Sequence, residues 1–347
     1  MTNPTLSIVV TSRNDNHGGD MTRRMTMFIN GLIRQANKFN FPIELILVEW
    51  NPPSDKSLLK EILPQPKGTD QLCLRYIIVP EETHRKYELS GAIPLYQMIA
   101  KNVGIRRATA PFVLCTNVDI LFSDEIFEIF ARNKFEENFF YRANRCDIPS
   151  GIDEKASFEN QLVFCKNNIL QRWGFDADFI DLIGLPKILT SRYSRWFTYA
   201  ILKPLRRYLY PYRSISSKID YYACGDFTLM SKKDWLNLDG YVELDLYSLH
   251  IDSLLLSAAM AAGMQQVVFP KEACVYHITH SDGWASMNPI QSWIYTRNNP
   301  ALDWKMVNEW SEYIIRHKIN YGINNSNWGF ADQKFKEYSF NTASTHS

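Results

Sequence analysis

PFVLCTNVDILF, residues 111–122, is the stretch that decides the fold. An apolar run from Phe112 to Cys115 gives way to Asn117-Val118-Asp119, and apolar residues then resume. This pattern is typical of a buried strand that ends by presenting polar oxygens at the tip of a sheet. A carboxylate in that place can hold a divalent cation. We therefore expect the rest of the chain to build a ligand site around Asp119.

Three strands with their connections are expected before this stretch. They cover residues 6–10, 43–48 and 74–79, with a helix over about 21–37 and another over about 94–108. A polar loop, residues 11–19, follows the first strand, where a doubly wound sheet places its ligand crevice. The first third of the chain therefore predicts an α/β nucleotide-binding half.

The remainder of the chain continues the alternation of helices and strands. Strands are expected over 139–144, 222–231, 267–269 and 273–280, and helices over 123–135, 233–238 and 253–262. We predict a Rossmann-like α/β fold with a mixed, mostly parallel central sheet flanked by helices. Residues 1–300 are expected to form one domain, with a ligand-binding half at 1–125 and a second half at 126–300. Residues 301–347, which are rich in tryptophan, are expected to form a C-terminal helical extension.

Composition excludes several classes of protein. Hydrophobic residues make up 46% and charged residues 22% of the 347 residues, as in ordinary globular proteins. The 38 basic and 37 acidic residues leave a net charge of +1, so we expect no nucleic-acid partner. The six cysteines form no CxxC pair, which favours reduced thiols and a cytoplasmic location.

Membrane association is expected to be peripheral at most. The N-terminus lacks the features of a signal peptide, and no run approaches the ~18 to 20 apolar residues of a membrane span. Residues 195–213 are both basic and aromatic. They predict a helix packed on the core, with contact to the inner face of a membrane as the alternative.

The order of motifs resembles glycosyltransferases of the GT-A fold, in a layout similar to family 2 of the nucleotide-sugar transferases. The matching pieces are SIVVTSRND, LILVEWNPP, AKNVGIRRA, NVD in place of the usual DxD, GDFTLMSKKDWLNLDGY, HID and YHITH. They span residues 6–282. The resemblance implies a GT-A-like catalytic domain that moves a sugar from a UDP- or GDP-linked donor to a hydroxyl acceptor on a glycan, a lipid or a small molecule.

The resemblance also implies a metal site. It places Asp119 on a Mn²⁺ or Mg²⁺ ion that neutralises the leaving diphosphate, with Asn117 in place of the first aspartate of DxD. His277 or His280 would supply a further ligand, and imidazole with carboxylate suits Mn²⁺ as well as Mg²⁺. The alternative is that Asn117 and Asp119 only close a turn or cap the following helix.

Other site residues follow from the same resemblance. The expected nucleotide-sugar contacts, besides Asn117 and Asp119, are Thr11, Ser12, Arg13, Glu49, Lys101 and Asn102. Asp226 would bind the acceptor, or else stabilise a turn. Arg106 and Arg107 are expected on a solvated helix face.

The resemblance implies that Asp252 is the catalytic base of an inverting transferase, because family 2 has an acidic residue at the head of the helix after the acceptor segment and Asp252 occupies that position. In a retaining enzyme it would position the acceptor instead. The alternative is a helix N-cap, a position that aspartate favours.

Two other classes compete with a transferase. A non-catalytic nucleotide-sugar or carbohydrate-binding protein with a degenerate fold would explain NVD in place of DxD. A nucleotidyltransferase would require a glycine-rich, basic first loop, and residues 11–20 contain only Gly18, Gly19 and Arg13 of those types. Asp176-Ala177-Asp178 is a literal DxD that no buried strand precedes, so we assign it no metal. No P-loop or GxSxG motif is present.

Overall fold

The computed structural model describes residues 3–132, 134–174, 219–280 and 300–341. The motif at 176–178 and the basic aromatic segment at 195–213 lie outside these ranges. Within them, no helix is long and apolar enough to cross a bilayer.

An eight-stranded sheet forms the centre of the molecule, in the order β10-β6-β9-β4-β1-β2-β3-β12. Its parallel middle consists of β4, β1, β2 and β3, and four of the seven pairings in the sheet are parallel. The strand bounds are β1 Leu6–Ser12, β2 Ile43–Trp50, β3 Leu72–Val79, β4 Phe112–Cys115, β6 Phe139–Arg142, β9 Thr228–Ser231, β10 Gln265–Val268 and β12 Lys336–Phe340. The predicted mixed, mostly parallel α/β sheet flanked by helices is confirmed.

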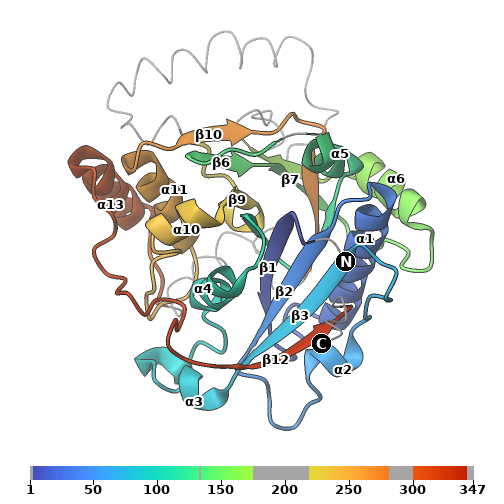
Figure 1. Cartoon of the computed structure of the whole chain (residues 1–347), viewed down its shortest axis with the longest axis horizontal. Coiled ribbons are helices and arrows are strands. Elements are labelled where there is room, and N and C mark those ends of the chain that lie inside the picture. Colours follow the sequence, from blue (N-terminus) through green and yellow to red (C-terminus); the bar gives the residue numbers. More distant parts are fainter. Residues whose placement is uncertain (1–2, 133, 175–218, 281–299, 342–347) are drawn as a thin grey trace.

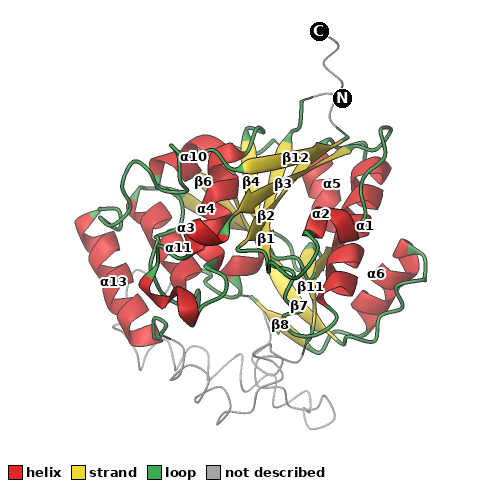
Figure 2. Cartoon of the chain, turned by 90° about the horizontal axis from the view of Figure 1, so that it is seen from below, coloured by secondary structure: helices red, strands yellow, loops and turns green. Residues whose placement is uncertain are grey.

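Helices cover both faces of the sheet because its central strands are apolar on both sides. All residues of β1 are buried: Leu6, Ile8 and Val10 join the core under α1, whereas Val9 joins the core under α4. Figure 2 shows α1, α2 and α5 on one side of the sheet, and α4, α10 and α11 on the other. The helix bounds are α1 Met21–Lys38, α2 Leu59–Ile62, α3 Glu81–His84, α4 Gln97–Arg107, α5 Asp124–Arg132, α10 Lys232–Asn237 and α11 Ile251–Ala261, with 3₁₀ turns at Glu88–Gly91 and Cys224–Asp226.

A second sheet of four strands lies beside the end of the first (Figure 2). Its order is β5-β11-β7-β8, with β5 Ile120–Phe122, β11 Cys274–Ile278, β7 Asn144–Ile148 and β8 Gln171–Trp173, and α6 (Phe158–Asn167) packs against it. The single strand predicted over 139–144 is wrong. Ala143 separates β6, which pairs with β9 and β10, from β7, which pairs with β11 and β8.

The C-terminal segment is part of the body of the fold. Its helix, α13 (Trp304–His317), packs on α11, which confirms the predicted helical extension. The segment then crosses the molecule, and β12 pairs antiparallel with β3 at the edge of the main sheet (Figure 1). The sequence did not predict this strand.

Arg106 and Arg107 hold this C-terminal segment, so the prediction that they face solvent is wrong. The guanidinium of Arg106 lies 4.0 Å from the ring centroid of Trp328, and its Nε donates to the Trp328 carbonyl at 2.9 Å. Arg107 donates to four backbone oxygens, those of Val103, Gly329, Phe330 and Gln333. An arginine fork suits such a cluster because it offers five donors in a fixed plane.

We expect Arg107→Met to destabilise the protein by about 2 to 3 kcal/mol, because it leaves several carbonyl oxygens of the C-terminal segment without donors. Urea unfolding followed by circular dichroism measures this. Arg85→Met is the matched control. Arg85 is 71% exposed and, among the described residues, pairs only with Glu81, so its replacement should lower the free energy of unfolding by less than about 0.5 kcal/mol. Equal losses in the two variants would contradict a clamping role for Arg107.

Candidate functional site

Strand pairing brings Asp119 together with two histidines. Asp119 lies between β4 and β5, and β5 pairs antiparallel with β11 so that Ile120 faces His277. The Ile278 N–H donates to the Asp119 carbonyl at 2.9 Å, which fixes the loop against β11. His280 follows two residues after β11 ends. The main sheet and the second sheet therefore meet at Asp119.

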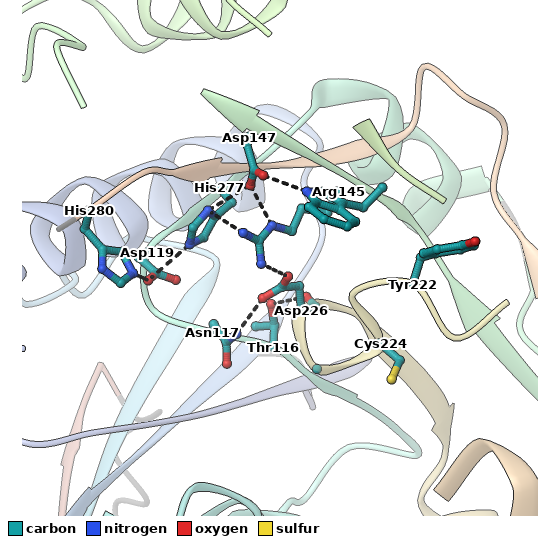
Figure 3. A network of polar contacts seen from close by, with 12 residues as sticks. Thr116, Asn117, Asp119, Arg145, Asp147, Tyr222, Cys224, Asp226, His277 and His280 are labelled. Atoms are coloured by element: carbon teal, nitrogen blue, oxygen red, sulfur yellow. Dashed lines mark hydrogen bonds and ion pairs between the residues drawn. The ribbon is translucent and has the colours of Figure 1, made fainter. Parts of the chain in front are cut away.

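The three side chains form a compact cluster (Figure 3). The Asp119 Oδ2 atom lies 3.6 Å from His277 Nε2 and 3.2 Å from His280 Nε2. One potential ligand atom from each residue lies within 4.8 Å of the other two. One carboxylate and two imidazoles are a donor set that Mn²⁺ accepts and that Mg²⁺ accepts less readily.

Two atoms of the cluster lack a hydrogen-bond partner among the described residues. They are Asp119 Oδ1 and His280 Nδ1, and both are buried. A buried acceptor without a donor costs free energy, and a bound cation would remove this cost at Asp119. The residues present therefore fit a divalent metal ion.

The carboxylates and histidines of the cluster shift one another's pKa values. Burial opposes ionisation of Asp119, but the two histidines outweigh it and hold the pKa of Asp119 well below its usual range. Burial and the charge of Arg145 oppose protonation of His277, but Asp119 and Asp147 outweigh them and raise the pKa of His277 to about 9. At neutral pH, a proton on His277 thus neutralises Asp119 in the way a cation would.

Arg145 and Asp147 form a layer behind the cluster that sequence reasoning missed. Asp147 Oδ1 lies 3.0 Å from His277 Nδ1 and accepts from Arg145 Nε at 2.7 Å. Arg145 also donates through Nη1 to Asp226 at 2.9 Å. Both residues lie on β7, which is parallel to β11, and their alternation with Cys146 and Ile148 was the available signal.

The side chain of Asn117 is bound within the chain. Its Oδ1 accepts from Gln97 Nε2 at 2.8 Å and from Lys101 Nζ at 3.0 Å, and its Nδ2 donates to Asp226 (Figure 3). Since the Asp119 carboxylate meets the histidines instead, the alternative of a helix cap at these two positions is wrong. The carboxylate of Asp226 accepts from Asn117 through one oxygen and from Arg145 through the other. The sugar contacts assigned to Asn117 and Asp226 stay predictions.

The first loop reaches the cluster of Asp119, His277 and His280 through Gly18. Thr11 Oγ1 donates to the Val48 carbonyl at 2.9 Å, the Ser12 hydroxyl contacts the Met25 sulfur, and Arg13 Nε donates to the Asn51 carbonyl at 2.6 Å. These bonds fix the start of the loop. Further along, Gly18 has a φ of +70°, and a Cβ there would lie 2.4 Å from His280 Nδ1.

We expect Gly18→Ala to weaken Mn²⁺ binding about tenfold, because the added methyl group would displace His280. Titration of the full chain with Mn²⁺ measures the affinity. Gly19→Ala is the matched control, since Gly19 also has a φ of +70° but its Cβ would meet nothing within 4 Å. If both variants lose affinity equally, backbone strain rather than the collision with His280 is the cause.

Glu49 and Asn102 are buried, and their side chains hold neighbouring backbone segments in place through hydrogen bonds. Both carboxylate oxygens of Glu49 accept from the Leu59 N–H, at 3.1 and 3.0 Å, and the residue is fully buried. Asn102 is equally buried and bonds the Tyr241 backbone and the Glu243 carboxylate. Contacts of Glu49, Lys101 and Asn102 with a nucleotide stay predictions.

Glu49 should make stability depend on pH. Burial raises its pKa to about 7 despite the hydrogen bond from Leu59, so the folded state holds a proton that the unfolded state has lost. The stabilisation that comes from protonated Glu49 is fully present below about pH 4.5 and is lost as the pH rises through about 7. Between pH 4.5 and 8, the free energy of unfolding of the wild-type protein should therefore fall by on the order of 3 kcal/mol relative to that of Glu49→Gln. Parallel stability curves for the two proteins, measured by urea unfolding, would contradict this.

Asp252 lies against the turn that carries Asp226. It is the second residue of α11, whose N-cap is His250, so the alternative of an N-cap role is wrong. Asp252 Oδ1 accepts from the Ser253 N–H at 3.0 Å, and Oδ2 would lie 2.8 Å from a Cβ at Gly225. Lys101, fully buried with a pKa lowered by that burial, donates to the Gly225 carbonyl at 3.0 Å. A chain of contacts therefore joins Asp252 to Asn117 and to the cluster of Asp119, His277 and His280.

Comparison with known proteins gives a distant likeness. No family model matches the sequence, and a search of curated proteins finds no match. Similar solved structures include S. aureus TarS 1–349 in complex with UDP-GlcNAc, at 12% identity and a TM-score of 0.44, covering 90% of this chain and 72% of that chain. A second structure of TarS 1–349 gives 14% identity, a TM-score of 0.42 and coverages of 90% and 71%. Likeness at this level does not identify a family.

Proposed function

We propose that this protein is a glycosyltransferase that moves a sugar from a UDP- or GDP-linked donor to a hydroxyl acceptor. The observation that carries the proposal is the cluster of Asp119, His277 and His280. It lies past the carboxyl end of β4, where an α/β sheet places its ligand, and Gly18 of the first loop contacts it. The motif order that resembles the GT-A transferases supports the same reading.

Asp119, His277 and His280 would hold a Mn²⁺ or Mg²⁺ ion in this enzyme. When bound, such an ion neutralises the charge that develops on a leaving diphosphate. Thr11, Ser12 and Arg13 would line the donor side, in the half formed by residues 1–125. The acceptor half would be residues 126–300.

Asp252 would take the proton from the attacking hydroxyl in an inverting reaction. Its position against Gly225 supports this role, because the turn at Gly225 and Asp226 lies between Asp252 and the metal cluster. Lys101 would keep that turn in place through the Gly225 carbonyl. A cytoplasmic location is part of the proposal, and contact with a membrane through residues 195–213 is its alternative to a helix packed on the core.

The test is to titrate the full chain with UDP- and GDP-sugars, with and without Mn²⁺, and to measure release of free nucleoside diphosphate. Metal-dependent donor binding with release supports the transferase. Donor binding that ignores Mn²⁺ and releases no nucleotide favours a non-catalytic binding protein, a reading that the internally bonded Asn117 also supports. Absence of donor binding would overturn both.

A further inference from the structure

One ring nitrogen of His277 faces two competing partners. His277 Nδ1 lies 3.0 Å from Asp147 Oδ1 and 2.9 Å from Arg145 Nη2. The carboxylate can only accept a proton, and the guanidinium can only donate one. An imidazole nitrogen carries either a proton or a lone pair. His277 Nδ1 therefore satisfies one of these two contacts at a time (Figure 3).

The choice of partner decides what the opposite nitrogen offers to Asp119. If the Nδ1–H group donates a hydrogen bond to Asp147, then Nε2 of the neutral ring has a free lone pair. This lone pair can point toward Asp119, 3.6 Å away, as metal binding requires. If Nδ1 instead accepts from Arg145, the proton of the neutral ring sits on Nε2 and points at the place where a cation would bind.

Asp147 is fixed in the position that favours metal binding. Its side chain is 1% exposed, Arg145 Nε donates to Oδ1 at 2.7 Å, and Trp173 Nε1 donates to Oδ2 at 2.6 Å. The β7–β11 pairing places Asp147 directly opposite His277. Rotation of this carboxylate would leave buried donors without an acceptor, so its orientation is imposed by the fold.

We propose that Asp147 is a positioning residue that holds the Nδ1 proton of His277 and so presents Nε2 to a divalent cation at Asp119, against competition from Arg145. This inference rests on the metal site of the proposed function. The two members of one ion pair then have opposite effects on the cation: Asp147 favours its binding, whereas Arg145 opposes it through both its hydrogen bond and its charge.

The test compares variants that each remove one charge of this ion pair. Asp147→Asn should weaken Mn²⁺ binding to the full chain by about 10- to 100-fold, the usual effect of losing a carboxylate behind a ligating histidine. Arg145→Gln should bind Mn²⁺ as tightly as the wild-type protein or more tightly. An ion pair that only holds the fold together would weaken binding in both variants, and that result would overturn the inference.

Asp234→Asn is the control for loss of a buried carboxylate. Asp234 is 4% exposed and bonds Ser231 and the Asn138 N–H outside the metal cluster, so its replacement should leave the Mn²⁺ affinity unchanged. Unchanged affinity in Asp147→Asn would overturn the inference while leaving the metal site in place. A wild-type protein that binds no Mn²⁺ would overturn the metal site and the inference together.

A spectroscopic measurement tests the proton directly, without any variant at Arg145 or Asp147. In metal-free wild-type protein labelled with ¹⁵N-histidine, at a pH above the His277 pKa of about 9, where the ring is neutral, the His277 Nδ1 signal should show an attached proton. The signal is assigned by its loss in His277→Gln. Should either variant of the ion pair fail to fold, this spectrum decides alone. An unprotonated His277 Nδ1 would overturn the inference.

Discussion

Replacing Asp119 by asparagine is expected to lower the rate of nucleoside diphosphate release by about a thousandfold. The variant keeps the shape of the side chain but removes the negative charge that two histidines face at 3.2 and 3.6 Å. Loss of a bound cation removes several kcal/mol of charge stabilisation, and each 1.36 kcal/mol is a factor of ten in rate. Release of free UDP or GDP from the donor, with saturating Mn²⁺, measures the effect.

Asp124→Asn is the matched control for the Asp119 variant. Asp124 begins α5 and pairs with Lys38 near the surface, so its replacement should change the rate less than twofold. Circular dichroism of both variants establishes that they are folded. A folded Asp119→Asn protein with near-normal turnover would remove the metal role from Asp119.

Replacing Asp252 by asparagine is expected to lower the transfer rate by about 10²- to 10⁴-fold, the range that a general base supplies. Donor affinity should stay within about threefold, because the proposed role of Asp252 is proton transfer and the turn at Gly225 and Asp226 separates it from the cluster of Asp119, His277 and His280. Single-turnover transfer measures the rate, and calorimetric titration measures donor binding.

Asp303→Asn distinguishes this effect from damage to a helix start. Asp303 is the N-cap of α13 and accepts from the Met306 N–H at 2.8 Å. Its replacement should lower the free energy of unfolding slightly and leave the transfer rate unchanged. Equal rates in the wild-type and Asp252→Asn proteins would leave Asp252 without a catalytic role.

The main sheet could be predicted because each of its central strands is a short local signal. Val9 and Ile46 lie in apolar runs with β-branched residues. A strand that is buried on both faces can be predicted from such a run alone, without knowing which strands pair with it. The pairing of Ile120 with His277 could not be predicted in this way, because it depends on contacts between distant parts of the chain.

The residues behind the metal cluster were missed for a similar reason. Arg145 and Asp147 look like loop residues in a region of weak period, and only the register with β11 places them next to His277. Glu49 is a different case. Its place after a predicted strand suggested a ligand contact, which stays a prediction, and its carboxylate accepts a hydrogen bond at the start of α2. Sequence position located the edge of the sheet, but it did not decide which side chains lie against Asp119.

The strand β12 has a consequence for synthesis on the ribosome. The salt bridge that closes the edge of the main sheet joins Arg75 to Glu337, which are separated by 262 residues. Until β12 emerges from the ribosome, β3 has unpaired backbone groups along one edge, and such an edge can pair with another nascent chain. A chain whose translation stops before β12 should therefore aggregate through the open edge of β3.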